Sequence, residues 1–510
     1  MDRLATVFPN RYVFNNGLWD NRQIRFRRFC KRKRGAYIAS VVSYSANCSL
    51  VDTFGRGDLS CYGKMALDKT VKTGNGQLIF HNEKASGDIR KGGISRRRAL
   101  QFCSLSFAGA VAGGSFWSIL KRLAGEEAPA DVFKGDAPDA KTLELWRKRG
   151  WLVEARHYLK LGRNVQCKVC PNNCILEPGD RSHCRNKINV DGTLYTMAYG
   201  NPCAFHVDPV EKKPLFHFLP GSYTFSIATS GCVFRCLNCQ NWDISQKKPE
   251  ETKDPVGAEI RLRPPLPATL PAADVRRVSM FPEDVAAIAK ALKCPSVSYT
   301  YSEPTAFYEY TYDSCKKVRE AGLKNILVTC GSIEDRAFRD LAQYVDAAHV
   351  DLKGFDEEIY QKLNSGKLSA ILRILKTYHE LGIWFEIINL IVPTYTDKPE
   401  MIKRMCGWIV ENLGADRPIH FSRFHPEHKL THLPPTPIDI LLKAREIARS
   451  QGLRYVYLGN VREVDDAETT YCPNCKKPII YRDIFSVTQI DLIDGRCKYC
   501  NEKIPGLWKV

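Results

Sequence analysis

Thr229-Ser230-Gly231-Cys232-Val233-Phe234-Arg235-Cys236-Leu237-Asn238-Cys239-Gln240-Asn241 is the stretch that decides the fold. It continues the apolar run 224–230, which is typical of a buried strand, so three cysteines leave one strand end in a Cys-x3-Cys-x2-Cys spacing. Three thiolates in one loop can hold three irons of a 4Fe-4S cluster, and the fourth iron is then open to a small molecule. The alternative is a closed site, either a structural zinc or a four-cysteine cluster completed by Cys203 or Cys184.

The chain after this loop alternates strand-like runs with helical stretches. The predicted strands are 224–230, 296–302, 324–330, 347–353, 384–393, 418–424 and 454–460, and the predicted helices include 282–292, 305–321, 334–345, 398–413 and 437–451. Near-continuous apolar strands separated by helices are typical of a parallel α/β sheet, either a barrel or a doubly wound sheet. In a barrel the working residues lie at the carboxyl ends of the strands.

Further motifs accompany the three cysteines, within 206–221, 299–305, 351–355, 386–393 and 420–426. Together with the cysteine loop they resemble the radical S-adenosylmethionine (SAM) superfamily. More narrowly, they resemble the radical SAM enzymes of the AmmeMemoRadiSam system, which are related to pyruvate formate-lyase activating enzymes. The resemblance runs from Cys167 to Trp508. It implies a partial (β/α)6 TIM-like barrel of the radical SAM type over 223–465, with a 4Fe-4S cluster on Cys232, Cys236 and Cys239.

The resemblance also implies which residues bind S-adenosyl-L-methionine. The open iron takes the amino and carboxylate groups of SAM, and reductive cleavage gives a 5′-deoxyadenosyl radical that abstracts hydrogen. The residues expected around SAM or the substrate are Asn241, Ser302, Glu303, Pro304, Thr329, Asp351, Lys353, Asn389 and His425. Singly, each is equally well explained as a satisfied polar residue at a strand end.

Two positions depart from the pattern of these families. Asn238 stands before the third cysteine, where an aromatic residue is common, so the usual contact with adenine is in doubt. Thr329-Cys330-Gly331 stands where close relatives have Thr-Asn-Gly, so the role of that asparagine is missing or is performed by another residue.

Two further cysteine groups flank the predicted barrel. Cys472, Cys475, Cys497 and Cys500 have the spacing of a zinc ribbon, which predicts a zinc-ribbon-like module over 466–510, with a single iron as the alternative metal. Cys167, Cys170, Cys174 and Cys184 predict a four-cysteine knuckle within 131–222, preceded by an amphipathic helix over 140–160. Spacing alone leaves open whether this second four-cysteine site holds zinc or an iron–sulfur cluster.

The N-terminal quarter carries most of the positive charge. The net charge is +19, and residues 1–128 contribute 22 Lys/Arg against 9 Asp/Glu, so the folded body gives little indication of nucleic-acid binding. We predict that 1–94 is disordered or precedes the true start of translation. Residues 95–130 combine Arg96-Arg97-Arg98, an apolar run and Ala128-Pro129-Ala130, which resembles a twin-arginine export signal; a basic linker with a short helix is the alternative.

These observations predict an oxidoreductase of the radical SAM type with an unknown substrate. One alternative is an activating enzyme that forms a glycyl radical on a protein partner, and a non-enzymatic alternative is a zinc-knuckle interaction module. The resemblance implies an electron donor of the flavodoxin or ferredoxin type and associates this branch with AMMECR1-like and Memo-like proteins. Because SAM and low-potential electrons are made in the cytoplasm, we expect cytoplasmic chemistry, with export or membrane tethering through 95–130 as the alternative.

Overall fold

The computed structural model describes residues 71–72, 78–79, 131–252 and 278–509. The chain divides into two compact units, Met1–Gly114 and Ser115–Val510. In the first unit the described residues are β1 (Val71–Lys72) and β2 (Leu78–Ile79), which pair antiparallel. The rest of the predicted extension 1–94, the signal-like segment 95–130 and residues 253–277 lie outside the described residues. Within the described chain, no helix combines the length and apolar character needed to cross a membrane.

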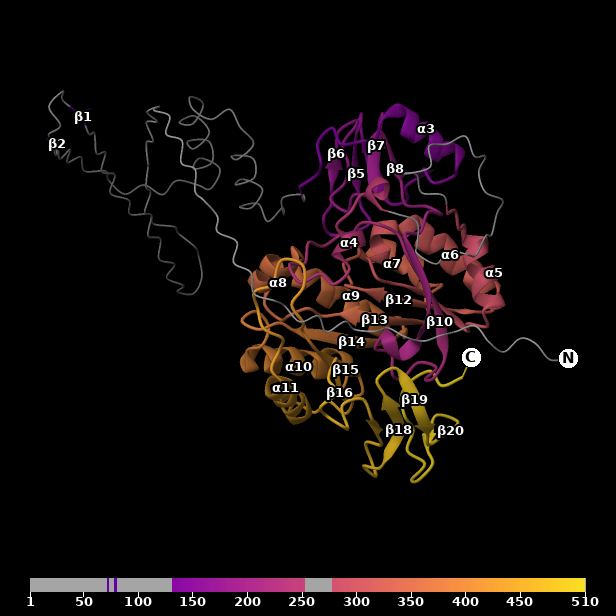
Figure 1. Cartoon of the computed structure of the whole chain (residues 1–510), viewed down its shortest axis with the longest axis vertical. Helices are drawn as coiled ribbons and strands as arrows, with labels where there is room; N and C mark the ends of the chain where they lie inside the picture. The colour runs from indigo at the N-terminus through magenta and orange to yellow at the C-terminus, as the bar shows by residue number, and fades with distance from the viewer. Residues whose placement is uncertain (1–70, 73–77, 80–130, 253–277, 510) are drawn as a thin grey trace, which may run out of the picture. The chain divides into compact units, whose positions relative to one another are not determined.

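The second unit is built on an eight-stranded sheet (Figure 1). Its strand order is β16-β15-β14-β13-β12-β11-β10-β9, and every neighbouring pair is parallel except β10 with β9. The strands are β9 (Ala204–Pro209), β10 (Tyr223–Ala228), β11 (Ser296–Tyr299), β12 (Lys324–Thr329), β13 (Ala347–Asp351), β14 (Trp384–Ile391), β15 (Ile419–Arg423) and β16 (Val456–Gly459). The chain is therefore an α/β protein whose parallel strands present their carboxyl ends at one edge.

Helices connect the parallel strands and cover their apolar side chains. They are α5 (Pro282–Ala291), α6 (Tyr308–Glu320), α7 (Asp335–Ala342), α8 (Glu357–Asn364), α9 (Leu368–Glu380), α10 (Pro399–Leu413) and α11 (Ile438–Ser450), with the short α4 (Trp242–Ser245), η1 (Val210–Lys212), η2 (Pro249–Glu251) and η3 (Pro304–Phe307). All four residues of β11 are buried, as are the first four of β13. Strands buried on both faces read as continuous apolar runs, which is why the sequence located them.

All seven predicted strands are present, and the five named helices are confirmed to within a few residues. The antiparallel edge strand β9 was not predicted, because residues 204–209 mix exposed and buried positions instead of forming an apolar run. Helices α8 and α9 were not among the named helices either. They fill the connection between β13 and β14, and Ser365 in a left-handed conformation separates them.

The predicted helix over 140–160 is wrong beyond its first half. Helix α3 (Ala140–Lys148) begins at Asp139, whose carboxylate accepts the Thr142 N–H at 2.7 Å. It ends because Gly150 has a φ of +74°, which a glycine adopts without strain, and the Trp151 N–H then bonds back to the Trp146 carbonyl at 2.9 Å. The chain continues in strands rather than in a helix.

These strands form the N-terminal module, two antiparallel three-stranded sheets. One has the order β3-β8-β7 and the other β4-β5-β6. Their bounds are β3 (Val153–Glu154), β4 (Tyr158–Leu161), β5 (Asn164–Cys167), β6 (Ile175–Leu176), β7 (Lys187–Val190) and β8 (Thr193–Thr196). The four cysteines of this module belong to the same core as the large sheet, whereas Trp146, Trp151, Leu152, Ile188 and Met197 form a separate small core.

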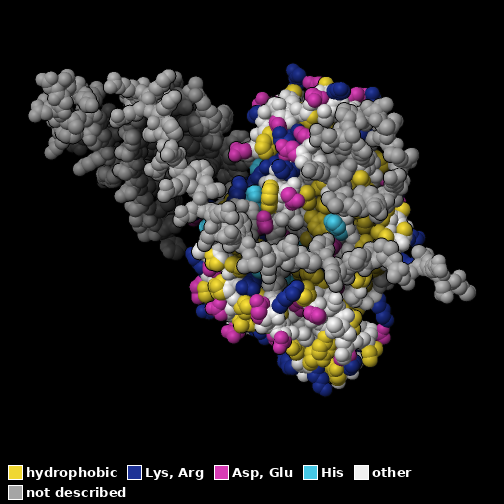
Figure 2. All heavy atoms as spheres, in the orientation of Figure 1, with side chains coloured by type: hydrophobic (Ala, Val, Ile, Leu, Met, Phe, Trp, Pro, Cys, Tyr) yellow, Lys and Arg dark blue, Asp and Glu magenta, His cyan; other side chains and the backbone are white. Residues whose placement is uncertain are grey.

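The C-terminal module is a separate small set of strands. These are β17 (Thr470–Tyr471), β18 (Pro478–Asp483), β19 (Ser486–Ile490), β20 (Leu492–Ile493) and β21 (Arg496–Cys497). Buried polar contacts attach the module to the segment before β10: Arg482 Nη2 donates to the Phe216 carbonyl at 2.6 Å, and His217 Nδ1 lies 2.7 Å from the Pro505 carbonyl. Figure 2 shows hydrophobic side chains beside Lys and Arg on the module's surface, where Ile484, Phe485, Ile490 and Ile493 are exposed.

Candidate active site

The three-cysteine loop lies at the carboxyl end of β10 and runs into α4. Gly231, with a φ of +80°, turns the chain away from the strand. The sulfurs of Cys232, Cys236 and Cys239 are half-buried, and each has one hydrogen-bonding neighbour. The Phe234 N–H donates to Cys232 Sγ at 3.4 Å, Asn364 Nδ2 donates to Cys236 Sγ at 3.2 Å, and the Ser245 hydroxyl lies 3.1 Å from Cys239 Sγ. Such hydrogen bonds stabilise thiolates and tune the potential of an iron–sulfur cluster.

The spacing of the sulfurs separates this loop from a zinc site. Among the described residues, the one group of three or more possible ligands within 4.8 Å of one another is Cys472, Cys475, Cys497 and Cys500. The three cysteines of the loop therefore do not converge on one point, either by themselves or with Cys184 or Cys203. A cubane, whose irons occupy separate corners, suits this wider set of sulfurs better than a single tetrahedral ion does.

Unpaired buried acceptors support a ligand site here. Within the described chain, the side-chain oxygens of Asn238, Asn364 and Asn389 are buried and accept no hydrogen bond. Asn238 belongs to the cysteine loop, Asn364 also donates to Cys236, and Asn389 lies on β14. Buried polar atoms in proteins are nearly always paired. These three acceptor oxygens therefore fit a polar cofactor that would donate hydrogen bonds beside the cluster.

The side chain of Glu303 is buried in the protein and does not point toward solvent. Its Oε1 accepts the Thr329 hydroxyl at 2.7 Å and the Thr305 hydroxyl at 2.8 Å, and its Oε2 accepts the Cys330 N–H at 2.7 Å. The carboxylate thus ties the end of β11 to the end of β12. Thr329, expected in the cofactor pocket, is one of its partners, and the hydroxyl of Thr329 also accepts the Gly331 N–H at 2.9 Å.

Asp351 and Lys353 form a charged pair at the end of β13. Lys353 Nζ lies 2.9 Å from Asp351 Oδ2, and His349 Nε2 lies 3.0 Å from Oδ1. Burial would raise the pKa of Asp351, but the charge of Lys353 and the hydrogen bonds from Lys353 and His349 hold it well below its usual range. Burial raises the pKa of the Cys236 thiol, and the Lys353 ammonium opposes that rise. Lys353 therefore offers positive charge to a thiolate of the loop.

The remaining expected residues differ in their contacts and in their exposure. Asn241 donates to the Tyr301 carbonyl at 2.9 Å, and Ser302 donates to the Thr229 carbonyl at 2.7 Å, so both brace the cysteine loop against the end of β11. Pro304 begins the short helix η3. Asn389 donates to the Leu352 carbonyl at 2.7 Å, while His425 is exposed on the loop after β15.

Sequence reasoning missed residues that contact the loop or the segment after β11. Asn364 comes from α8, far from the motif in sequence, so only the fold reveals its bond to Cys236. Asp208, within a quoted motif but given no role, accepts from Lys213 Nζ at 2.7 Å and from the Tyr301 hydroxyl. Burial lowers the pKa of Lys213 to about 8, against the opposing effect of Asp208.

The C-terminal cysteines are close enough to share one ion. Cys472 Sγ lies 3.5 Å from Cys500 Sγ, and Cys475 Sγ lies 3.7 Å from Cys497 Sγ. Four 2.3 Å bonds to a tetrahedral zinc place sulfurs ~3.8 Å apart. The four cysteine sulfurs therefore fit a structural metal ion.

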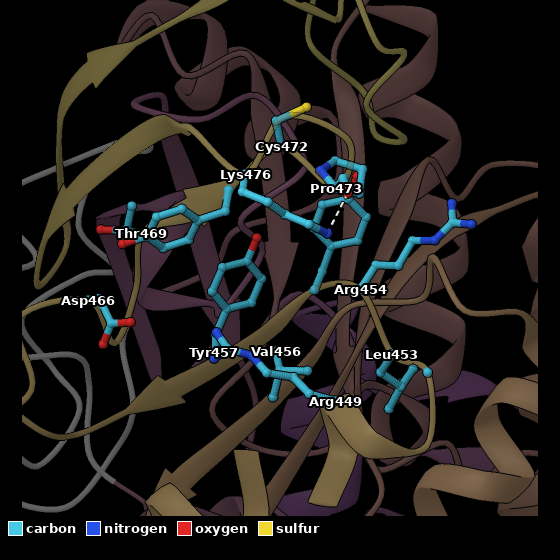
Figure 3. Close-up of a pocket in the computed structure, with 13 residues that line it drawn as sticks. Arg449, Leu453, Arg454, Val456, Tyr457, Asp466, Thr469, Cys472, Pro473 and Lys476 are labelled. Atoms are coloured by element: carbon cyan, nitrogen blue, oxygen red, sulfur yellow. Dashed lines mark hydrogen bonds between the residues drawn. The ribbon is translucent and has the colours of Figure 1, made fainter. Parts of the chain in front are cut away.

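A cavity of about 600 Å³ lies beside this module, at the opposite edge of the sheet from the cysteine loop. Figure 3 shows Tyr457 of β16 and Lys476 among the residues that line the cavity, and Lys476 Nζ donates to the Pro473 carbonyl at 2.6 Å. The cavity opens at the amino end of β16, whereas the loop follows the carboxyl end of β10. It is therefore separate from the candidate active site.

Comparison with known proteins assigns the family. The model of the radical SAM superfamily matches residues 226–406, from β10 to α10, a range that contains the cysteine loop. An uncharacterized protein of Methanocaldococcus jannaschii is 43% identical over 354 residues, covering 69% of this chain and 98% of that protein. The chain belongs to the radical SAM superfamily.

Solved structures give weaker matches. A domain of a pyruvate-formate lyase-activating enzyme from Bacteroides vulgatus aligns with a TM-score of 0.29 and 17% identity over 32% of this chain and 98% of that one. Streptococcus suis SuiB bound to S-adenosylmethionine aligns with a TM-score of 0.35 and 14% identity over 52% of this chain and 56% of that one. The assignment to the superfamily rests on the family model, which matches residues 226–406.

Membership in the radical SAM superfamily has direct consequences. Its members are enzymes, and membership implies an iron–sulfur cluster and cleavage of SAM. The non-enzymatic alternative, a zinc-knuckle interaction module, is therefore set aside. The loop of Cys232, Cys236 and Cys239 lies inside the matched range, whereas the two flanking cysteine groups lie outside it.

Proposed function

We propose that this radical SAM enzyme abstracts hydrogen from a substrate held at the carboxyl-end edge of its parallel sheet. The observation that carries the proposal is the cysteine loop: three half-buried sulfurs, each with one hydrogen-bonding neighbour, spread too widely for a single ion. Three cysteine ligands leave one iron of a cubane without a protein ligand. When bound there, SAM and the reduced cluster supply a 5′-deoxyadenosyl radical.

The residues of the chain hold and shield this chemistry. Cys232, Cys236 and Cys239 would hold the cluster, and Lys353 would offset part of its negative charge. The unpaired oxygens of Asn238 and Asn389 would accept hydrogen bonds from SAM. Glu303 acts as a positioning residue, because its carboxylate ties the end of β11 to the end of β12.

The wider architecture belongs to the same proposal. Seven parallel strands with helical crossovers suit a partial barrel of the radical SAM type, in which the sheet curls around the substrate. The C-terminal module would hold one structural zinc on its four converging cysteines. Action on a glycyl-radical protein, association with AMMECR1-like or Memo-like proteins and an electron donor of the flavodoxin or ferredoxin type stay predictions.

Formation of 5′-deoxyadenosine tests the function. The full chain is purified and reconstituted without oxygen, then given dithionite and SAM, and the nucleoside is quantified. We expect 5′-deoxyadenosine from the wild-type enzyme and none from Cys232→Ala. Cys406→Ala is the matched control, because Cys406 is a buried thiol of α10 outside all three cysteine groups. Equal yields from Cys232→Ala and Cys406→Ala would refute the proposal.

A further inference from the structure

The four cysteines of the N-terminal module form a second metal-binding group outside the family match. Cys167 ends β5, Cys170 and Cys174 lie in the turn before β6, and Cys184 precedes β7. All four are free thiols and between 4% and 8% exposed. Four free thiols in one buried region, at the close spacing typical of metal ligands, indicate a shared ligand.

The distances between the cysteine sulfurs distinguish a site for a single ion from a site for an iron–sulfur cluster. The C-terminal group shows the arrangement expected for one tetrahedral ion, with sulfurs 3.5 Å and 3.7 Å apart. No three sulfurs of the N-terminal group, which lies wholly within the described residues, are within 4.8 Å of one another, as is also true of the cluster-binding loop. The described part of the chain therefore holds one cysteine group whose sulfurs all lie within 4.8 Å of one another and two groups in which no three sulfurs do. A cubane separates its cysteine ligands more than a single ion does, because each thiolate binds a different corner.

We propose that Cys167, Cys170, Cys174 and Cys184 bind a second iron–sulfur cluster, of the 4Fe-4S class, with every iron ligated by the protein. Four ligands close the site, so this cluster has no open iron for SAM or substrate. The inference goes beyond the proposed function and does not depend on the substrate.

The second site lies directly against the catalytic loop. Asn172, between Cys170 and Cys174, donates from Nδ2 to the Val233 carbonyl at 2.9 Å. The Asn186 Nδ2, two residues after Cys184, donates to the Ser230 carbonyl at 2.6 Å. The two cysteine groups are therefore neighbours through contacts made by the loops that carry them.

Positive side chains lie between and beside the two groups. The Arg235 guanidinium donates to the Cys232 carbonyl at 3.0 Å and also to the His183 carbonyl, next to Cys184. Lys187, beside Cys167 and Cys184, pairs with Glu309 at 2.5 Å, and both side chains are fully buried. Arg235 offsets part of the negative charge of cysteine-ligated clusters that would otherwise repel each other, whereas the charge of Lys187 is balanced by Glu309.

Adjacent clusters can pass single electrons. A low-potential one-electron donor protein would be oxidised by one electron, the second cluster would take that electron, and its transfer to the catalytic cluster would return the second cluster to its oxidised state. The net change is one electron moved from donor to catalytic cluster, with no bond made or broken. The second cluster thus serves as a one-electron store beside the site where SAM is cleaved.

Metal analysis of the intact, anaerobically purified and reconstituted chain tests the inference without measuring activity. We expect about eight irons, about eight sulfides and about one zinc per chain, from two cubanes and one structural ion. About four irons with about two zincs would overturn it.

Variants distinguish failure of this inference from failure of the proposed function. Replacing Cys232, Cys236 and Cys239 together by Ala should leave about four irons in a cluster that dithionite reduces and whose electron paramagnetic resonance (EPR) spectrum SAM does not change. Cys170→Ser should lose the other four irons and keep a SAM-responsive spectrum. If the triple variant binds no iron while Cys170→Ser retains the full iron content of the wild type, the second cluster is refuted and the catalytic one stands. Should the triple variant not fold, the metal content of the intact chain decides.

Discussion

Gly231 of the catalytic loop lies against the backbone of Cys184 in the N-terminal module. A Cβ at Gly231 would overlap the Cys184 carbonyl oxygen and come within 2.8 Å of Asn186 Oδ1. The positive φ of Gly231 adds a second reason for glycine at this position. One residue without a side chain therefore allows the loops of two cysteine groups to touch.

Gly231→Ala should destabilise both loops. The backbone strain of a left-handed alanine costs roughly 1–2 kcal/mol, and the overlap adds ~1–3 kcal/mol. Gly382→Ala is the control, because Gly382 also has a positive φ but its Cβ would meet open space. Urea unfolding and iron analysis should show a larger loss of stability and of iron for Gly231→Ala. Equal losses in the two variants would contradict the close packing.

Glu303→Gln should lower stability even without SAM. The amide would turn a donor toward either the Cys330 N–H or the Thr305 N–H, and an unpaired buried donor costs about 1–3 kcal/mol. Thermal unfolding of the protein without SAM measures the loss, with the exposed Glu463→Gln as control. If Glu303→Gln unfolds like the wild type and only its affinity for SAM falls, the carboxylate acts on the cofactor directly and not as a positioning residue.

Acid should loosen the attachment of the C-terminal module. Burial lowers the pKa of His217 to about 4, and its partner Glu386, despite the opposing effect of burial, is held at a pKa of about 2 chiefly by His420. Because both pKa values are below those of the unfolded chain, stability is lost as pH falls, from 6.5 through 4 for His217 and from 4.5 through 2 for Glu386.

The pH dependence of the free energy of unfolding measures this effect. His217→Gln should remove up to roughly 3 kcal/mol of the decline between neutral pH and the folded pKa of His217. Loss of metal in acid affects wild type and variant alike, so the difference between the two curves isolates His217. Parallel curves would contradict the assignment.

Cys475→Ala should release the metal of the C-terminal module and leave the iron content unchanged. A module whose small core is built around Cys472 and Cys497 depends on its ion for folding. Limited proteolysis should then cut after residue 466, while Cys406→Ala stays resistant. Retention of zinc by Cys475→Ala would show that the metal lies elsewhere.

The sequence located the parallel strands and the cysteine groups because both depend on local pattern. Buried parallel strands are continuous apolar runs, and metal ligands from one loop have fixed spacings. The edge strand β9 and the bond from Asn364 to Cys236 depend on contacts between distant segments, so no local pattern marks them. The helix over 140–160 was extended too far because its apolar period outweighed the stop signal at Gly150.

Spacing also could not separate a zinc site from a cluster site at Cys167, Cys170, Cys174 and Cys184. Both metals take four thiolates, and the difference lies in the distance between sulfurs, which only the fold supplies. The role expected for Glu303 shows the same limit. A carboxylate that follows a strand suggests a ligand for an ammonium group. In the fold, the Glu303 carboxylate instead accepts four hydrogen bonds from neighbouring residues.

We expect the loop of Cys232, Cys236 and Cys239 to leave one iron of its cluster open for SAM. The EPR spectrum of the dithionite-reduced, anaerobically reconstituted Cys170→Ser protein, recorded before and after addition of SAM, tests this directly. We predict a cluster signal whose shape changes when SAM binds. A cluster signal that SAM leaves unchanged would mean that a side chain already fills the fourth position, and the open iron would be refuted.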